Sequence, residues 1–424
     1  MTLFRGCHEY LLYCRMRLTL GIKRRSAEIP DIPKPFRPPS VLMHVYPLAR
    51  TELRIDPNWP IESFTAALIG IGGPIFDNII SKIRADIVSS QDDAHTRDML
   101  RRLAAHIIQQ AGVVPLDLLL FSGKLVLSKT GDANKQRKAM PVGEGSYASV
   151  YQGSYRSLRG SNQKQQKTDV EVFALKCMRF LSNHTAEDLR NQRQRMILEL
   201  VNTWMLAHPY ILSLKAVHFD PELSPFILVL PWMPNSNVRV RLQHYVDGRQ
   251  AFTGKLHNLS NRWIGQIACG LEYVHTEGIV HGDVRGVNIL VDQSDSIKIA
   301  DFGLSLYAEG MSKNYASARE GNPAWTAPEL FDRKTMQRLR GTREGDIYSF
   351  AMVCIELWTL TDPVIFPGEA RPYRPNSPDP KCQEQMSDSL WRIVSNCWDE
   401  DPRKRFTALE LRRELSAIGI AASP

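Results

Sequence analysis

The chain has 424 residues, of which 43% are hydrophobic and 23% are charged, and its formal net charge is +8. This length predicts one large domain plus an extension, and the composition is ordinary for a globular protein with a sizeable core. The longest uncharged apolar stretch, Ser63–Phe76, is too short to span a bilayer, and the run Tyr10–Cys14 is too short for the core of a signal peptide. These features argue against a transmembrane or secreted protein, and we expect a soluble one.

The seven cysteines form an odd set that contains no C-x-x-C pair and is scattered through apolar segments. This pattern favours reduced, structural thiols over a disulfide framework or a zinc site. We therefore expect a cytoplasmic or nuclear protein.

The first 115 residues are predicted to precede the main domain. Residues 1–40 hold eight Lys or Arg against three acidic residues, and Pro30–Pro39 contains five prolines, which is typical of an exposed, disordered arm. No regular aromatic pattern accompanies the charges, so we favour a solvated arm and expect no nucleic-acid partner. Within residues 41–115, apolar stripes over Ile75–Ile87 and Met99–Ile108 predict a helical extension, for which a scaffold role is favoured over partner binding.

After about residue 115 the pattern becomes mixed. Short apolar runs between polar loops predict strands near Leu125–Leu127, Ser149–Tyr151, Val172–Cys177 and Phe226–Leu230. From Leu259 onward the pattern is mainly helical, with strand–loop interruptions at Ile279–Leu290 and Ser296–Ile299. We predict an α+β fold in which a small sheet-rich lobe is followed by a larger helical lobe.

Three features of the sheet-rich part are compatible with phosphate binding. In Val142–Val150, two glycines stand two positions apart, which lets a hairpin backbone approach phosphates closely. Lys176 ends an apolar strand, where it is costly to bury unless an anion and a carboxylate meet it. Glu199, on a predicted helix over Arg195–Leu206, is a candidate for that carboxylate. Taken singly, a plain turn, an exposed lysine and a surface glutamate would each be commoner.

The most informative stretch is His281–Leu290, followed by the D-F-G sequence that begins at Asp301. Phosphoryl transfer needs a carboxylate at the incoming hydroxyl and oxygen ligands for magnesium. Asp283 can supply the first, while Asn288, five residues on, and Asp301, eighteen residues on, can supply the second. One such residue could simply cap a turn, but all three at these intervals indicate phosphoryl-transfer chemistry.

Together these motifs resemble the signature set of eukaryotic protein kinases, which joins a glycine-rich loop, a strand lysine, a catalytic loop and D-F-G. The similarity continues in family order, with A-P-E ending at Glu329, a D-x-W-S-F-like segment at Asp346–Phe350, and Arg405 in the place of the arginine that pairs with the A-P-E glutamate. The W-T-A-P-E sequence that starts at Trp325 is similar to tyrosine kinases and their tyrosine-kinase-like relatives. The resemblance implies a bilobal kinase domain over residues 116–420, with an N-lobe over about 116–233 and a C-lobe over about 234–420.

The resemblance also implies the cofactors, ATP and Mg²⁺, and the residues that hold them. Lys176 would contact the α- and β-phosphates and pair with Glu199, while Asn288 and Asp301 would hold the metal. Leu230 would be the gatekeeper before the hinge that receives adenine. The residues expected to line the nucleotide site are Val142, Gly143, Gly145, Val150, Ala174, Lys176, Leu230, Trp232, Met233 and Leu290.

For the transfer step, the resemblance implies that Asp283 orients and deprotonates a protein hydroxyl and that Arg285 neutralises charge on the γ-phosphoryl oxygens. The hydroxyl of serine or threonine is favoured over that of tyrosine. Two alternatives stay open, a pseudokinase scaffold on the same fold and a small-molecule phosphotransferase, because the latter class shares the H-G-D pattern at His281–Asp283. The sequence leaves the substrate, the pathway and the oligomeric state open.

Three positions depart from the family pattern. Gly282 replaces the arginine that in the family grips a phosphorylated activation segment, Asn322 stands where threonine is usual, and Ala351 replaces a glycine. None of them removes a catalytic group, so we expect an active kinase with little need of activation-segment phosphorylation. The candidate autophosphorylation sites, which could equally be plain surface hydroxyls, are Ser305, Tyr307, Ser312, Tyr315 and Ser317.

Overall fold

The computed structural model describes two compact units, the first within residues 1–205 and 213–232 and the second within 206–212 and 233–424. The described residues are 74–89, 97, 100, 101, 104, 108, 123–127, 141–144, 148–157, 171–178, 196, 197, 199–220, 224–247, 254–302, 306–307, 323–332, 337–338, 341–363 and 386–422. The predicted arm, residues 1–40, lies outside them, as do the loop glycine Gly145, Asn322, and the activation-segment hydroxyls of Ser305, Ser312, Tyr315 and Ser317.

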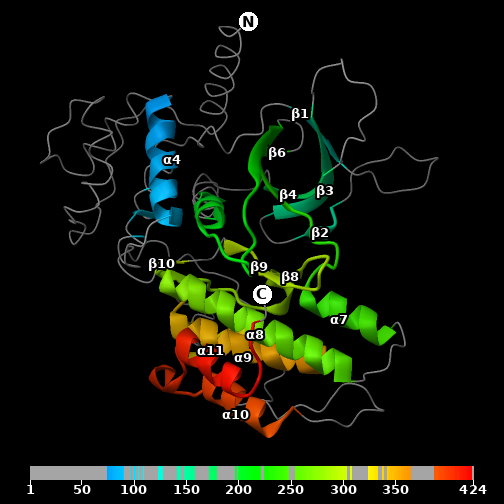
Figure 1. Ribbon diagram of the computed structural model, residues 1–424, viewed down its shortest axis with the longest axis vertical. Coiled ribbons are helices and arrows are strands. Elements are labelled where there is room, and N and C mark those ends of the chain that lie inside the picture. Colours follow the sequence, from blue (N-terminus) through cyan, green and yellow to red (C-terminus); the bar gives the residue numbers. More distant parts are fainter. Residues whose placement is uncertain are drawn as a thin grey trace, which may run out of the picture. The chain divides into compact units, whose positions relative to one another are not determined.

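The first unit is built on an antiparallel sheet with the strand order β1-β3-β4-β6-β5, and β2 pairs with β3 (Figure 1). The four runs that the sequence predicts as strands fall within β1, β3, β4 and β6. The strands are β1 (Gly123–Leu127), β2 (Gly143–Glu144), β3 (Ala148–Ser157), β4 (Glu171–Met178), β5 (Ala216–Asp220) and β6 (Ser224–Pro231).

Side chains alternate between the two faces of this sheet, as the two-residue period of a strand requires. On one face, a buried apolar cluster packs Phe173, Leu175 and Cys177 of β4 against Ile227 and Val229 of β6. The opposite face carries the intervening residues of the same strands. The cluster therefore fixes which side chains of β4 are turned away from the core.

Besides the helical residues 97, 100, 101, 104 and 108, where Leu100, Ala104 and Ile108 of the predicted stripe are buried, two helical segments belong to the first unit. The helix α4 (Pro74–Ser89) falls in the predicted extension, and its Ile80, Ile83 and Ile87 are buried at spacings of three and four residues, as expected for one apolar stripe. The other segment comprises the helical residues 196, 197 and 199–205, and we call it the Glu199 helix.

The second unit is mainly helical, with short two-stranded ladders between the helices. Its helices are α7 (Val238–Asp247), α8 (Gly254–Thr276), α9 (Arg343–Thr359), α10 (Asp388–Cys397) and α11 (Ala408–Ala417), with the 3₁₀ turns η2 (Gly286–Asn288), η5 (Pro323–Trp325), η6 (Pro328–Leu330) and η7 (Pro402–Lys404). The ladders pair β7 (Ile279–Val280) with β10 (Leu306–Tyr307), β8 (Ile289–Val291) with β9 (Ile297–Ile299), and β11 (Phe331–Asp332) with β12 (Gln337–Arg338).

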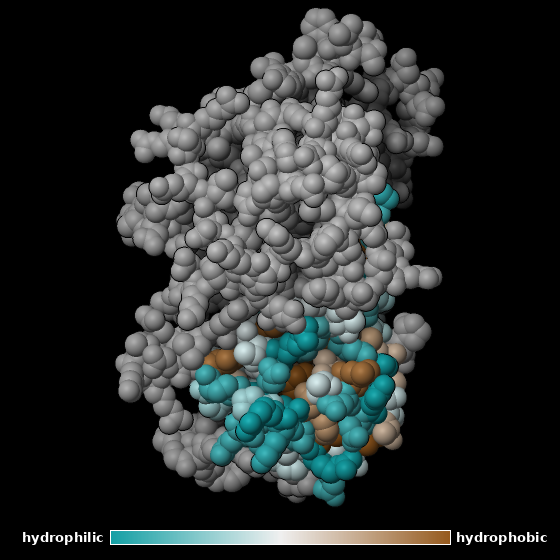
Figure 2. All heavy atoms as spheres, turned by 90° about the vertical axis from the view of Figure 1, so that its left-hand side faces the viewer, coloured by the Kyte–Doolittle hydropathy of each residue, from teal (hydrophilic) through white to brown (hydrophobic). Residues whose placement is uncertain are grey.

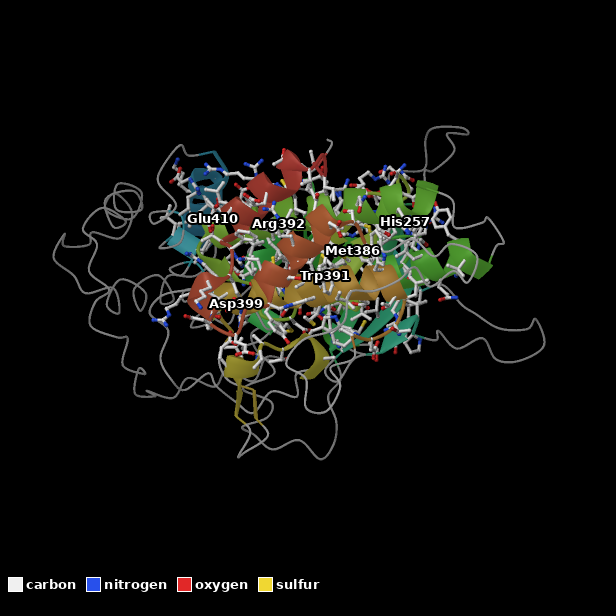
Figure 3. The ribbon with its side chains drawn as sticks, turned by 90° about the horizontal axis from the view of Figure 1, so that it is seen from below. His257, Met386, Trp391, Arg392, Asp399 and Glu410 are labelled. Atoms are coloured by element: carbon white, nitrogen blue, oxygen red, sulfur yellow. The ribbon has the colours of Figure 1, made fainter. Side chains whose placement is uncertain are left out.

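The core of this unit surrounds α9, whose residues from Gly345 to Trp358 are all buried. A helix that is apolar on every side is stable only inside a core, and α7, α8 and α10 pack against it. One contact is the stacking of the His257 ring of α8 on Trp358, with ring centroids 4.8 Å apart. Figure 3 views the unit from below, with Trp391 and Arg392 of α10 labelled.

Two expectations about the chain as a whole can be compared with the described residues. Among them, no helix combines the length and the apolar character needed to cross a membrane. The four described cysteines, Cys177, Cys269, Cys354 and Cys397, form no disulfide. The face of the helical unit seen in Figure 2 is mainly hydrophilic, with apolar residues scattered among polar ones.

Candidate functional site

One face of the sheet collects three of the apolar residues predicted to line a nucleotide site. In the pairing of β3, β4 and β6, Val150 lies opposite Lys176, and Ala174 lies opposite Leu230. Directly opposed residues in antiparallel strands project to the same side, so these four side chains share the face that points away from the apolar cluster. Val142 precedes β2 and is joined to β3 by a backbone hydrogen bond from its N–H to the carbonyl of Val150, at 2.7 Å.

Lys176 and Glu199 form an ion pair with an Nζ–Oε1 distance of 2.6 Å. Their side chains are mostly buried, with 17% and 12% exposed. A buried ammonium needs a carboxylate or another acceptor, because an unpaired charge in this environment is costly. The pair expected from the sequence is therefore present, and it places a cation on the same sheet face as Val150 and Ala174.

The segment after β6 leads from the first unit into the second through Trp232 and Met233, both half-buried. A turn follows, closed by the N–H of Ser236 donating to the carbonyl of Met233 at 3.1 Å. The N–H of Val291 donates to the carbonyl of Ser236, and Asn237 forms a bridge with Leu290. These bonds fix β8, and with it Leu290, against the start of the predicted hinge.

Asp283, Arg285 and Asn288 are brought together in the loop before β8. The side-chain amide of Asn288 donates to the Asp283 backbone carbonyl at 2.9 Å and to its carboxylate Oδ2 at 2.8 Å. The guanidinium Nε of Arg285 lies 3.3 Å from the same Oδ2. Because the Asn288 nitrogen is used in this way, its amide oxygen is the atom that can meet a metal ion.

Asp301 follows β9, which pairs with β8, and the N–H of Ala300 donates to the Asn288 carbonyl at 2.8 Å. Asn288 thus stands just before β8 and Asp301 just after β9, at the same end of this antiparallel pair. The backbone of Asp301 has a φ of +66°, in the left-handed region that side chains other than glycine rarely adopt. Such strain persists only where the surrounding structure holds it, and it is frequent at functional sites.

The donor set fits Mg²⁺ better than a metal that needs a full protein cage. A carboxylate and an amide oxygen are hard ligands, and Mg²⁺ is commonly held by one or two such groups together with substrate phosphates and water. Within the described part of the chain, no cluster of three His, Cys, Asp or Glu side chains suited to a metal exists.

His281 links the loop to the segment around Asp301. Its Nε2 lies 3.0 Å from the carbonyl oxygen of Ala300, and its ring meets Phe302 edge to face with centroids 4.9 Å apart. Its Nδ1 accepts the N–H of Asp283 at 3.2 Å. A fully buried imidazole therefore ties the backbone of Asp283 to that of Ala300, the residue before Asp301.

The carboxylate of Asp346, near the start of α9, binds the backbone of the same loop. It accepts the N–H of His281 and of Gly282, both at 2.8 Å, and lies 2.9 Å from Nε2 of His275. Burial by itself raises the pKa of Asp346, but the hydrogen bond and charge of His275, the charge of His281 and the N–H of Gly282 outweigh it, so that this pKa is lowered. Asp346 is thus an ionised clamp on the backbone of the loop.

Glu356, ten residues further along α9, supports the other end of the loop. Its Oε2 accepts the N–H of Gly286 at 2.9 Å and the indole N–H of Trp325 at 3.0 Å. Burial raises the pKa of Glu356, although these two donors and Arg239 oppose the shift. A Cβ added at Gly286 would lie 2.4 Å from Oε1 of Glu356, so this contact leaves room only for glycine.

Comparison with known proteins supports the interpretation of this geometry. The sequence profile of the family described as protein tyrosine and serine/threonine kinase matches residues 137–415. The chain belongs to this family. Within it, the chain is similar to the probable serine/threonine-protein kinase drkC of Dictyostelium discoideum, with 29% identity over 294 residues, covering 65% of this chain and 34% of that protein.

Two further relatives cover the same part of this kinase. The tyrosine-protein kinase SPK-1 of Girardia tigrina is 26% identical over 54% of this chain and 46% of its own length. The serine/threonine/tyrosine-protein kinase HT1 of Arabidopsis thaliana is 25% identical over 62% of this chain and 60% of its own length. The chain thus spans between a third and three fifths of the length of these relatives.

The A-P-E segment of this kinase is anchored as the family resemblance implies. The guanidinium of Arg405 donates to both carboxylate oxygens of Glu329, at 2.6 and 2.9 Å. It also donates to the backbone carbonyls of Glu344 and Asp399, at 3.1 and 2.9 Å. The side chain of Arg405 is completely buried, so the η6 turn is fixed to the helical core by a single cation.

Sequence reasoning missed the parts played by Asp346 and Glu356. Asp346 was recognised as a motif residue, but nothing in its spacing shows that its carboxylate binds two loop amides. Glu356 carried a usable signal, since it is one charge within the apolar run from Ala351 to Trp358. A charge in such a run is costly unless it is paired, so this position was a candidate for a buried contact.

Proposed function

We propose that this kinase transfers the γ-phosphoryl group of ATP to a hydroxyl of protein substrates, with Mg²⁺ as the metal. The observation that carries the proposal is the grouping around the Asp283 carboxylate, which accepts a hydrogen bond from the Asn288 amide and lies 3.3 Å from Nε of Arg285, close to the segment that bears Asp301. In the kinase family, to which the chain belongs, residues of these types act together in phosphoryl transfer.

In this proposal, the side chains act mainly by positioning and by charge. Lys176, oriented by Glu199, binds the α- and β-phosphates. Asp283 accepts the proton of the acceptor hydroxyl through its carboxylate, whose Oδ2 is already oriented by the Asn288 amide. Arg285, 3.3 Å from that oxygen, is placed to meet charge that develops on the transferred group.

The metal would be held by the carboxylate of Asp301 and the amide oxygen of Asn288. When bound, Mg²⁺ supplies neutralisation of the phosphate charge. The adenine and ribose are proposed to lie against the apolar set of the sheet and hinge. That set comprises Val142, Gly143, Gly145, Val150, Ala174, Leu230, Trp232, Met233 and Leu290.

We also propose a bilobal kinase domain over residues 116–420, with an N-lobe over about 116–233, a C-lobe over about 234–420, and a helical extension in front. For the acceptor, serine or threonine is favoured over tyrosine. The names of the relatives support an alcohol acceptor in a protein but include serine/threonine, tyrosine and mixed kinases. Phosphoamino-acid analysis of the reaction product distinguishes the acceptors.

The test uses the purified full-length chain with labelled ATP, Mg²⁺ and a panel of protein substrates. Asp283→Asn should lower turnover by about 10² to 10⁴-fold, the usual contribution of a general base, while ATP binding is kept. The matched control is Asp388→Asn, at an exposed position in the first turn of α10, which should leave turnover unchanged. Chelation of the metal should abolish transfer, and added Mg²⁺ should restore it.

The same assay separates the two alternatives. A chain that binds ATP but labels no acceptor under any of these conditions is a pseudokinase scaffold. Transfer to small alcohols or aminoglycosides but not to proteins indicates a small-molecule phosphotransferase. Loss of activity in Asp283→Asn and Asp388→Asn alike would refute the specific role of Asp283.

Independence from activation-segment phosphorylation is a separate part of the proposal, motivated by Gly282. Replacing the five candidate autophosphorylation sites between Asp301 and Glu329 by Ala or Phe should leave turnover unchanged. A large loss of turnover would contradict constitutive activity. The replaced residues are Ser305, Tyr307, Ser312, Tyr315 and Ser317.

A further inference from the structure

The Glu199 helix is buried around its whole circumference. Its nine described residues, Met196, Ile197 and those from Glu199 to Met205, each expose 9% of their surface or less. Successive helix residues are about 100° apart around the axis, so nine positions sample every side. A sheet can cover only one side of a helix, and the remaining sides need another segment of the chain.

Part of that cover is α4, in the extension more than 100 residues earlier (Figure 1). The Arg84 side chain of α4 contacts Trp204 twice. Its Nε donates to the Trp204 backbone carbonyl at 3.4 Å, and its guanidinium carbon lies 5.1 Å from the centroid of the indole ring. Ile80 and Ile83, on the buried stripe of α4, are completely buried beside this contact.

The contact lies at the C-terminal end of the Glu199 helix, where the last four carbonyls lack intrahelical partners. The Thr203 carbonyl is satisfied by the N–H of Leu214 at 3.1 Å, and the Trp204 carbonyl by Arg84. A cation at this end also meets the negative pole of the helix dipole. Arg84 therefore fixes the position of the helix end by a hydrogen bond, a charge and a cation–π contact.

Glu199 stands five residues before Trp204 on the same helix, a rise of about 7.5 Å. Because a short buried helix moves as a rigid body, a shift or rotation at Trp204 displaces the carboxylate of Glu199. The ion pair with Lys176, at 2.6 Å, has little tolerance for such a displacement. The position of Arg84 is thereby coupled to the position of the phosphate-binding lysine.

We propose that Arg84 is a positioning residue for the Lys176–Glu199 ion pair, and that α4 is a built-in cover of the Glu199 helix. The inference rests on the proposed kinase function, because it assigns the ion pair to ATP binding. It adds that the extension belongs to the working unit of the enzyme and is more than an appended scaffold.

The test compares Arg84→Ala with Lys82→Ala in the full-length chain. Lys82 is the matched control, since it lies on the same helix and pairs with Asp86 at 2.7 Å on the exposed side. Arg84→Ala should raise the KM for ATP roughly 5- to 30-fold, the factor that corresponds to losing a contact of this type. Lys82→Ala should leave it unchanged. A general loss of folded enzyme would lower kcat and leave KM unaltered.

A second comparison asks whether Arg84 acts through Glu199. In a Glu199→Gln background, the further change Arg84→Ala should have no additional effect on the KM for ATP. If the two substitutions raise the KM for ATP by factors that multiply in the double variant, the inference is wrong. It is also wrong if Arg84→Ala alone leaves this KM unchanged. Arg84→Lys keeps the charge but not the planar fork, so a smaller rise in KM is expected, and this variant replaces Arg84→Ala if the latter does not fold.

Hydrogen exchange of the amides over residues 199–205 gives a readout that needs no activity. Faster exchange in the Arg84 variant than in Lys82→Ala supports the cover, and equal exchange overturns it. If the wild-type chain transfers no phosphoryl group, the proposed function is wrong. The exchange measurement still shows whether α4 covers the Glu199 helix.

Discussion

The ion pair between Arg405 and Glu329 allows a test of how much a buried ion pair stabilises this fold. The exposed pair between Arg403 and Asp401, close by in the sequence, serves as the comparison. The perturbation is Glu329→Gln, which keeps the shape of the side chain and removes its charge. Arg405 is completely buried, and four of its hydrogen bonds have been described above. After the change, its charge has no carboxylate partner in the described structure.

The expected loss of folding stability in Glu329→Gln follows from the burial of the ion pair. Removing one partner of a buried ion pair costs about 3 to 5 kcal/mol, because an uncompensated charge stays behind. Glu329 is 27% exposed, so solvent screens part of the loss, and we expect a value at the lower end, about 3 kcal/mol. For a folding unit of this size, that corresponds to a fall in Tm of about 6 to 12 °C.

The assay is urea unfolding and thermal unfolding of the wild type, Glu329→Gln and the control Asp401→Asn. Asp401 forms the same bidentate pair with Arg403, at 2.9 and 3.0 Å, but Arg403 is 88% exposed. The control should change stability little, and asparagine keeps the capping hydrogen bond to the Arg403 N–H. Equal losses in the two variants would refute the argument that burial sets the strength of the Arg405 pair.

Three further predictions concern the loop and the last helix. Gly286→Ala brings a Cβ into contact with the buried Glu356 carboxylate, so stability should fall by about 1 to 3 kcal/mol and turnover with it, measured by unfolding and kinase assay. Asp346 has a lowered pKa in the folded state, so the stability that its ionised carboxylate contributes should be complete above about pH 5. This contribution should disappear as the pH falls through the folded-state pKa. The measurement is the difference in unfolding free energy between the wild type and Asp346→Asn, followed from pH 7 to pH 3. Thr407→Ala removes the capping box with Glu410 at the start of α11 and should cost about 1 kcal/mol in urea unfolding.

The sequence was sufficient for residues whose chemistry constrains both their type and their spacing. Asp283 and Asn288 were predicted to lie together from their five-residue spacing in the motif, and the structure joins them by a hydrogen bond from the Asn288 amide to the Asp283 carboxylate. The strand lysine Lys176 and its partner Glu199 could be paired in advance because a buried ammonium requires a carboxylate. The four predicted strands followed from short apolar runs that are separated by polar loops.

The supporting residues could not be predicted in the same way. Asp346, Glu356 and Arg84 act through burial and through partners that lie 31 to 120 positions away in the sequence. Nothing local limits them to a fixed spacing from those partners, and only the tertiary structure brings them together. Isolated signals existed, such as a glutamate within an apolar helix, but they indicated that a contact was needed without indicating its partner.

The structure also bears on why Gly282 can stand where the family usually has arginine. Its N–H is bound by the buried carboxylate of Asp346, and its φ of +77° is one that glycine adopts at no steric cost. A Cβ added at Gly341 would lie 3.4 Å from the Cα of Gly282, so the two backbones run close together. The loop conformation is thus set by α9 and by backbone geometry, neither of which depends on a charge added to the activation segment. For the proposed activity, we therefore expect control to act on the position of the Glu199 helix rather than on the loop of Asp283.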